Sequence, residues 1–349
     1  MMRYLVWCVF CFSALAFAAA APAQAGKETE TKPAVDLRRP PTDGPVDVAV
    51  GLYITNVVAI DETRETFEVG GYLAGQWQDP RLVLPGNPPG KRRTFRLQDL
   101  WTPAIEAANS ISHKTNQYWL EADGNGTVTY RERFDAAYST DFELRKFPFD
   151  TQVLRFEFQP FLSSDSQMRF RLQALPGTGI STDRQTELAA WQLGNLRYRA
   201  DKLNLDPFQD PSHEAIFEVT VKRRSGFYLW KIFVPLILIT LVPVVVFWID
   251  VKEFDWILKI PMTMLLSMVA FQFTIARDLP RLGYITFLDA VFLASFVFCF
   301  LGIIEITTVY LLQKHGRRPV AVSIHSAGKW AYPLAYFAVL SILAIRFLA

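Results

Sequence analysis

Residues 215–248 read AIFEVTVKRRSGFYLWKIFVPLILITLVPVVVFW, and the sequence changes character within this stretch. Up to Lys222, apolar and polar side chains alternate with a period of two, which is typical of a β-strand with one buried face. Residues 227–248 are almost all apolar, and a run of this length suits the ~20 residues that a helix needs to cross a bilayer. We therefore expect a β domain to end near Gly226 and a membrane domain to follow it.

On the N-terminal side, the same period-two pattern predicts an all-β domain. Residues 154–159 alternate strictly, and similar runs occupy 48–58, 66–78 and 127–134. Asp123-Gly124-Asn125-Gly126 has the composition of a hairpin turn between two strands. Short alternating strands separated by turns indicate antiparallel strands in an immunoglobulin-like sandwich, expected over residues 46–226.

On the C-terminal side, four apolar segments predict an all-α transmembrane domain over residues 227–349. The expected helices cover 227–248, 257–275, 287–312 and 330–349. Aromatic residues at membrane interfaces belong near the ends of such helices. The residues in these positions are Trp230, Trp248, Trp256, Tyr284 and Trp330. The alternative, a soluble four-helix bundle, fits the length of the apolar runs poorly.

The N-terminus has the features of a secretory signal peptide. Arg3 precedes an apolar run over residues 5–20, and Ala23-Gln24-Ala25 offers a cleavage site with small residues. A retained membrane anchor is the alternative. We expect a signal peptide over 1–25, a flexible leader over 26–45, and a sandwich outside the cell. The basic loop before the fourth helix would then be cytoplasmic, as the positive-inside rule requires, with the C-terminus outside.

Composition excludes several other classes of protein. The net charge is +2, which gives no electrostatic basis for nucleic-acid binding. Of the three cysteines, Cys8 and Cys11 lie in the signal and Cys299 in an apolar segment, so the exported domain has no disulfide. No GxSxG, HExxH or glycine-rich phosphate loop is present, and no Cys/His cluster suggests a metal. We expect neither an enzyme nor a cofactor.

The second apolar segment carries a polar stripe. Residues spaced by three or four positions share one face of a helix. The residues with this spacing are Asp255, Lys259, Thr263, Leu266, Ala270, Phe273 and Arg277. Ionisable groups in a bilayer face water or a partner, so the stripe is expected to line a pore shared by several subunits. The alternative is that it packs against the other helices of its own subunit.

Within this expected pore, side-chain type suggests function. Rings of Leu266 and Phe273 would form a hydrophobic gate, and rings of Asp255 and Lys259 would select ions by charge. Pro261 removes one backbone hydrogen bond from the same helix. Asp255 favours cations, whereas a lysine ring would repel them, and cation conduction is the expectation retained here.

Several motifs together resemble the pentameric ligand-gated ion channels, in the bacterial branch that lacks the disulfide. The resemblance covers residues 46–349 in the family's order. The motifs are Trp101-Thr102-Pro103, Phe147-Pro148-Phe149-Asp150-Thr151-Gln152, Arg223-Arg224 before Tyr228-Leu229-Trp230, Pro235, and Leu279-Pro280-Arg281 before Tyr284. The short connection over residues 313–320 leaves no room for a large intracellular domain.

The resemblance implies a homopentamer in the plasma (inner) membrane of a bacterium, in contact with the lipid bilayer. A small-molecule agonist would bind between neighbouring sandwiches and open a path for inorganic ions. The residues that would couple binding to opening are Glu62, Glu65, Phe147, Pro148, Phe149, Asp150, Arg224, Pro280 and Arg281. Among them, Glu62, Arg224 and Asp150 are expected to form a buried charged cluster.

By similarity, the agonist site would use aromatic and polar residues of the sandwich. The candidates are Asn109, Gln159, Phe161, Tyr198 and Phe208. Gln159 and Val58 depart from the residues of amine-gated members, which argues against a primary amine as the agonist. Two alternatives stay open: protons as the signal, acting on Glu62, Glu65, Asp150 and His213, or a membrane-anchored binding domain that does not conduct.

Overall fold

The computed structural model describes residues 36–83, 92–160, 168–181, 188–203, 212–249, 254–276 and 282–348. The chain divides into two compact units, Met1–Asp36 and Leu37–Ala349. The predicted signal peptide lies outside the described residues, as does the leader up to residue 35. The second unit contains both the β domain and the helices.

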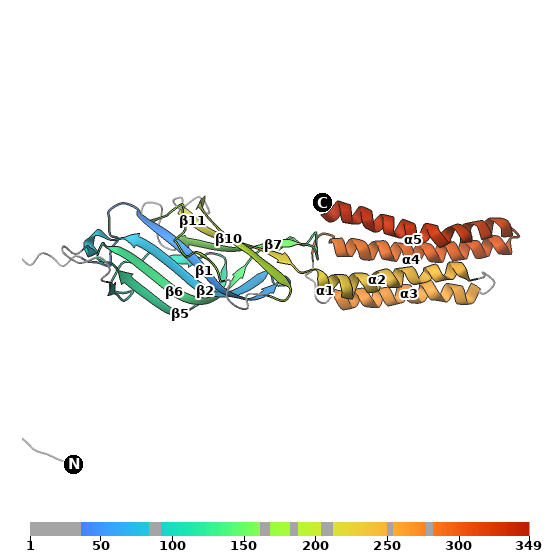
Figure 1. Cartoon of the computed structure of the whole chain (residues 1–349), viewed down its shortest axis with the longest axis horizontal. Coiled ribbons are helices and arrows are strands. Elements are labelled where there is room, and N and C mark those ends of the chain that lie inside the picture. Colours follow the sequence, from blue (N-terminus) through green and yellow to red (C-terminus); the bar gives the residue numbers. More distant parts are fainter. Residues whose placement is uncertain are drawn as a thin grey trace, which may run out of the picture. The chain divides into compact units, whose positions relative to one another are not determined.

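The β domain consists of two sheets (Figure 1). The strands of the first sheet follow the order β3-β5-β6-β2-β1-β8, with β9 also paired to β1. Their bounds are β1 Val46–Asp61, β2 Thr66–Gln78, β3 Arg93–Thr94, β5 Ser110–Ala122, β6 Thr127–Ser139, β8 Met168–Phe170 and β9 Gly179–Ile180. The second sheet has the order β10-β11-β7-β4. Its strands are β10 Trp191–Leu203, β11 Ser212–Arg223, β7 Thr151–Pro160 and β4 Ile105–Ala107.

Aromatic side chains from both sheets meet in the core of the sandwich. Phe67 of β2 stacks on Tyr138 of β6, with ring centroids 5.4 Å apart. Phe156 of β7 contacts both rings edge-on, at 5.1 and 4.9 Å. These residues occupy the apolar positions of the alternating pattern, since alternate side chains of a strand point to one face. The predicted sandwich is confirmed.

The predicted hairpin turn is also present. It connects β5 to β6, and the Gly126 amide donates to the carbonyl of Asp123 at 3.1 Å. Gly126 has a φ of 79°, in the left-handed region that glycine adopts without steric cost. The Asp123 carboxylate accepts hydrogen bonds from the amides of Asn125 and Thr127, at 2.9 and 2.8 Å.

The first predicted span is helical throughout but irregular. It consists of α1 (Gly226–Tyr228), a π-helical segment η2 (Leu229–Phe233), α2 (Val234–Leu241) and a 3₁₀ segment η3 (Val242–Trp248). Pro235 and Pro243 lie at the starts of α2 and η3. Because proline donates no backbone hydrogen bond, the regular α-helical ladder is interrupted near each of them.

The other spans are α3 (Phe254–Ile275), α4 (Phe287–Lys314) and α5 (Arg318–Leu348), which run alongside the first (Figure 1). All four spans are long and apolar enough to cross a membrane. Pro261 lies inside α3, which stays one helix. The last helix begins at Arg318 rather than at Trp330, so the predicted start is wrong. Its first turns contain Ser323, His325 and Lys329. Because these residues are polar, a search for apolar runs does not detect the start of the helix.

Hydroxyl groups join the helices inside the bundle. Tyr332 of α5 donates to the carbonyl of Thr240 in α2 at 3.3 Å. The hydroxyls of Ser295 in α4 and Tyr336 in α5 lie 2.8 Å apart. Such polar contacts between helices are favoured in a bilayer, where water is not available as a partner.

Candidate functional site

A buried arginine lies at the end of the sandwich that leads into the helices. Along β11, Phe217, Val219 and Val221 point into the core, and Arg223 continues this inward face with 4% of its surface exposed. Its Nε and Nη2 donate to the two carboxylate oxygens of Asp150, at 2.7 and 3.1 Å. Its Nη1 donates to Glu62 at 2.6 Å. A buried arginine is stable here because both carboxylates compensate its charge.

Aromatic rings surround the same guanidinium. Its central carbon lies 4.0 Å from the ring centre of Trp191, 4.7 Å from Phe147 and 5.8 Å from Tyr228. Burial alone would lower the pKa of Arg223, but the hydrogen bonds and charge of Asp150, followed by Glu62, raise it above its usual value. The side chain is therefore a fixed positive charge at the junction.

The predicted cluster contained the wrong arginine. Glu62 and Asp150 do come together, but around Arg223, whereas the Arg224 side chain is exposed. The reason is the period of two along β11, because a residue next to an inward-facing position faces outward. The alternation that predicted the strand was sufficient to choose between the two arginines.

The loop between β6 and β7 contacts the helices through aromatic rings and the backbone. Phe149 packs against Phe233 of η2 and Phe287 of α4, with centroids 6.2 and 5.8 Å apart. Phe147 contacts Tyr228 of α1 at 4.8 Å. The amide of Phe287 donates to the carbonyl of Arg145 at 2.8 Å. The sandwich is thus attached directly to the first and third spans.

Tyr284, in the connection between α3 and α4, bonds to the same loop. Its hydroxyl accepts from the amide of Leu144 at 3.0 Å and donates to the carbonyl of Phe142 at 3.4 Å. The Arg145 guanidinium lies 5.0 Å from the Tyr284 ring centre. Sequence reasoning placed Tyr284 in the interfacial belt and in the motif after Leu279-Pro280-Arg281, but it missed this contact, because a pairing across some 140 residues leaves no local signal.

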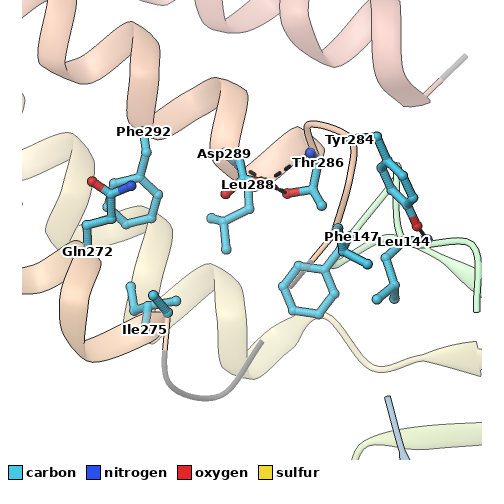
Figure 2. A pocket seen from close by; sticks show the side chains of 11 residues that line it. Leu144, Phe147, Gln272, Ile275, Tyr284, Thr286, Leu288, Asp289 and Phe292 are labelled. Carbon is cyan, nitrogen blue, oxygen red and sulfur yellow. Dashed lines mark hydrogen bonds between the residues drawn. The ribbon is translucent and has the colours of Figure 1, made fainter. Parts of the chain in front are cut away.

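The loop, α3 and α4 also enclose a cavity of about 250 Å³ (Figure 2). Phe147 and Leu144 line it from the loop, and Gln272 and Ile275 from α3. On the α4 side, Thr286 caps the helix: its hydroxyl accepts from the Asp289 amide at 3.1 Å, and Asp289 accepts from the Thr286 amide at 3.0 Å. This capping box fixes where α4 begins and the linker ends.

The structure gives less evidence about the role of the other predicted coupling residues. Pro148 is buried in the loop, and Glu65 is exposed in the turn after β1 with a φ of 55°. Pro280 and Arg281 lie outside the described residues. The coupling role of all these residues stays a prediction.

The predicted polar stripe of α3 is exposed in the single chain. Lys259, Thr263, Leu266, Ala270 and Phe273 are all exposed, and both Leu266 and Phe273 show 70% of their surface. The side of α3 that packs onto the other helices contains instead Ile257, Pro261 and Met268. The alternative in which the stripe packs within its own subunit is therefore wrong for these residues. The Asp255 side chain and Arg277 lie outside what the structure describes.

The hydroxyl groups of α3 are bonded to their own helix. Thr263, Ser267 and Thr274 donate to the carbonyls four residues earlier, at 2.7, 2.9 and 3.0 Å. These bonds satisfy the hydroxyl hydrogens without a neighbouring helix.

Two of the predicted agonist residues that the structure describes are held by hydrogen bonds within their own sandwich. Asn109 holds strands together, because its amide nitrogen donates to the carbonyls of Ser139 and Arg155, both at 2.9 Å, and its oxygen accepts from the Glu157 amide at 3.1 Å. The Tyr198 hydroxyl donates to the carbonyl of Arg171 at 2.7 Å, and burial raises its pKa to about 12.

The remaining agonist candidates give little evidence about a binding site. Gln159 is half-buried in β7, where it pairs with Glu106 of β4. Phe161 and Phe208 lie outside the described residues. Within the described part of the chain, no group of three or more His, Cys, Asp or Glu side chains could hold a metal ion.

Known proteins match both halves of the chain. The profile described as "Neurotransmitter-gated ion-channel ligand binding domain" matches residues 35–225, and "Neurotransmitter-gated ion-channel transmembrane region" matches 232–333. A proton-gated ion channel of Gloeobacter violaceus is 26% identical over 317 residues, which cover 89% of this chain and 87% of the relative.

Animal receptors are similar as well. The glycine receptor subunit beta of Rattus norvegicus is 26% identical over 295 residues, covering 78% of this chain and 57% of the relative. The acetylcholine-gated chloride channel subunit acc-1 of Caenorhabditis elegans is 26% identical over 290 residues, covering 80% and 61%. The chain thus spans little more than half the length of these animal proteins. It belongs to the neurotransmitter-gated ion-channel family, with that family's extracellular ligand-binding sandwich and multi-pass membrane domain.

Proposed function

We propose that identical copies of this chain form a homopentamer whose shared pore, lined by α3, opens when a signal outside the cell acts on the sandwiches. The observation that carries the proposal is the exposed face of α3. In a bilayer, a face with a lysine and several hydroxyls is costly unless it meets water. One chain has no means of enclosing that water, whereas a ring of copies does.

The route from sandwich to pore runs through the junction. Arg223 fixes β11 to the loop that bears Asp150, and β11 ends only a few residues before α1. The same loop bonds to Tyr284, which belongs to the connection at the end of α3. A displacement of the sandwich end would therefore act on the connection between α3 and α4 through the hydrogen bonds of Tyr284.

Orientation follows from the basic turn between α4 and α5. Lys314, His315, Arg317 and Arg318 are all exposed there. Positive residues of short loops stay on the cytoplasmic side, which puts the sandwich outside the inner membrane of a bacterium. Cation conduction is the expected selectivity, with Lys259 as the residue that opposes it.

Protons are a second candidate signal, since one similar protein is named as proton-gated. At the junction, Asp150 and Glu62 are engaged by Arg223, so protonating them would release a buried guanidinium. Current recordings at stepped pH, without any other ligand, distinguish this mechanism from small-molecule gating.

The pore assignment is tested by cysteine accessibility in planar bilayers containing the full-length protein. Thr263→Cys and Ala270→Cys should react with a charged aqueous thiol reagent and change the current. Met268→Cys, on the buried side of the same helix with 0% exposure, is the matched control and should not react. If both stripe positions stay unreactive under every condition that gives current, α3 does not line the pore. A protein that gives no current under agonist screening and pH steps would support the non-conducting alternative.

A further inference from the structure

An acid and a histidine face each other between α4 and α5, away from both the junction and the α3 stripe. Nδ1 of His325 in α5 lies 3.2 Å from Oε1 of Glu305 in α4. Both side chains are largely buried, with 12% of the histidine and 18% of the glutamate exposed. Among the described residues, His325 is the only group within ion-pair distance of Glu305. We refer to these two residues as the Glu305–His325 pair.

Each member of the pair also has a polar atom without a partner. Over the ranges that the structure describes, no hydrogen bond satisfies Oε2 of Glu305 or Nε2 of His325, although both atoms are buried. Unsatisfied polar atoms are rare inside proteins, because losing water without gaining a partner costs free energy. Stability alone therefore does not explain why an acid and a histidine occupy this position.

An aromatic ring covers the histidine. Phe247 of η3 is 2% exposed, and its ring centre lies 5.5 Å from that of His325. Gly328, three residues after the histidine, gives this ring its place on α5. A Cβ there would come within 2.6 Å of Cε1 of Phe247. In such apolar surroundings, a net charge on the pair is costly.

The lysines and arginines around the pair are held elsewhere or exposed. On α5, Lys329 lies one turn beyond the histidine, but its Nζ is 4.8 Å from the ring centre of Trp248. Lys314 and Arg318 are exposed in the basic turn, and Lys259 belongs to the exposed stripe of α3. The η3 segment contains no titratable side chain. The other titratable side chains near the pair on α4 and α5, of types that are neutral around pH 7, are Cys299, Tyr310 and Tyr332.

The number of protons on the pair decides its net charge. With one titratable proton, the pair is neutral overall, whether the proton is on the carboxyl or on the imidazole. Without that proton the net charge is −1, and with a second proton it is +1. Two groups this close titrate as a unit, so each step belongs to the pair and not to one residue. A second proton leaves an imidazolium with no counter-charge, which favours separation of the two side chains.

The pair lies near the end of α4 that is distant from the sandwich. Glu305 is 18 residues beyond Phe287, the first residue of the helix. This corresponds to about 27 Å at 1.5 Å per residue, close to the ~30 Å of the hydrocarbon core. The exposed basic turn follows less than three helical turns later. In the proposed orientation, protons therefore have only a short apolar distance to cross from the cytoplasm.

α4 and α5 also meet at their opposite ends, next to the sandwich. The rings of Phe287 and Phe347 lie 6.0 Å apart, and Phe287 contacts Phe149 of the loop between β6 and β7 at 5.8 Å. From the same loop, Nζ of Lys146 donates to the carbonyl of Leu348 at 3.4 Å. A change in how α5 lies on α4 would therefore reach the loop that holds Arg223 through Asp150.

We propose that the Glu305–His325 pair is a proton-binding site that takes its protons from the cytoplasm and adjusts the packing of α5 on α4. Adding the second proton opens the contact, and the junction receives this change through the far ends of the two helices. The site is independent of any signal that acts on the sandwich. The inference rests on the proposed function for the orientation of the chain and for the current, whereas proton binding by the pair does not depend on it.

Proton binding is measured by NMR on the full-length protein, labelled with ¹⁵N-histidine, in nanodiscs of neutral lipid between pH 5 and pH 9. His325→Gln identifies the signal of His325 among the four histidines. Glu305→Gln keeps the shape of the acid and removes its charge, so it should move the midpoint of the His325 titration by about one pH unit or more. His315, exposed in the basic turn, is the control and should titrate identically in both proteins. An unchanged His325 titration in Glu305→Gln overturns the proposal.

The effect on current is measured in inside-out patches from cells that express the full chain, with the outer solution kept constant. Lowering the cytoplasmic pH from about 7.5 to about 5.5 should change the current of the wild type and of the control His315→Gln by about twofold or more. Glu305→Gln, His325→Gln and the double variant should all lack this response, because either change removes the shared titration. Thermal melting verifies that each variant is folded.

The outcomes separate this inference from the proposed function. A channel that opens but responds to cytoplasmic pH equally in wild type, Glu305→Gln and His325→Gln overturns the role of the pair and leaves the proposed function intact. A response of the pair only to acid on the sandwich side would also overturn it. Absence of current under every condition contradicts the proposed function, and the NMR titration then decides by itself whether the pair binds protons.

Discussion

Arg223→Gln and Arg224→Gln should have very different effects, although the residues are adjacent. Arg223 is buried and bonded to Asp150 and Glu62, whereas the Arg224 side chain is exposed. Glutamine is shorter than arginine and neutral. In Arg223→Gln, the Asp150 carboxylate, itself only 2% exposed, loses the two donors that compensate its charge.

The structure sets the magnitude of this loss. Removing one partner of a buried ion pair costs about 3–5 kcal/mol, because the other charge is left uncompensated. The contact with Trp191 at 4.0 Å adds about 0.5–2 kcal/mol. A change of 1 kcal/mol shifts the melting temperature of a domain of this size by roughly 2–4 °C, so 3–5 kcal/mol corresponds to a drop of roughly 6–20 °C. For an exposed arginine, the loss is about 0–1 kcal/mol.

Intrinsic fluorescence of the full-length protein in nanodiscs measures this difference, because Trp191 lies directly against the guanidinium. Lys222→Gln, on the outward face of β11, is the control and should melt like the wild type. The reasoning is refuted if Arg224→Gln lowers the melting temperature as much as Arg223→Gln. A melting temperature of Arg223→Gln equal to that of the control would refute it as well.

Three further predictions concern the pore and the sandwich. Leu266→Ala should raise the leak current without agonist, because a smaller side chain wets a hydrophobic constriction; unchanged opening would exclude Leu266 as the gate. Lys259→Ala should raise cation conductance and move the reversal potential in asymmetric salt toward that of the cation, whereas no change would place Lys259 away from the ions. Glu132→Gln should lower stability at pH 7 and flatten the loss of stability in acid. Burial would raise the pKa of Glu132, but hydrogen bonds from His113, Tyr130 and Thr115 hold it below the ordinary value of 4.5. A lowered folded pKa stabilises the protein above about pH 4.5, and this stabilisation is lost as the pH falls through the folded value. Melting curves from pH 7 to pH 3 measure it, and parallel curves for the two proteins would contradict the assignment.

The two-part fold was predictable because each half of the sequence has one dominant pattern. Period two gave the strands around Phe156 and Phe217, and long apolar runs gave the helices. The start of α5 was missed because its first turns are polar, and hydropathy detects contact with lipid rather than helical structure. The exposed face of α3 was predictable, since the spacing from Lys259 to Phe273 already places these residues on one side.

Contacts between distant segments were less predictable. The bond between Tyr284 and Leu144 depends on how the sandwich and the helices fit together. The sequence around each residue contains no local pattern that predicts this bond. The burial of Arg223 could have been predicted from the sequence, because Arg223 continues the inward-facing positions of β11.

The hydroxyls of Thr263, Ser267 and Thr274 donate to their own helix, so their hydrogens point away from the stripe. An ion passing this face would meet oxygen lone pairs, which replace the hydration of a cation and repel an anion. We expect that discrimination by sign is set here by the direction of hydrogen bonds, spaced one or two helical turns apart, and not only by formal charge. On this expectation, the backbone of α3 would take part in ion recognition without touching the ion.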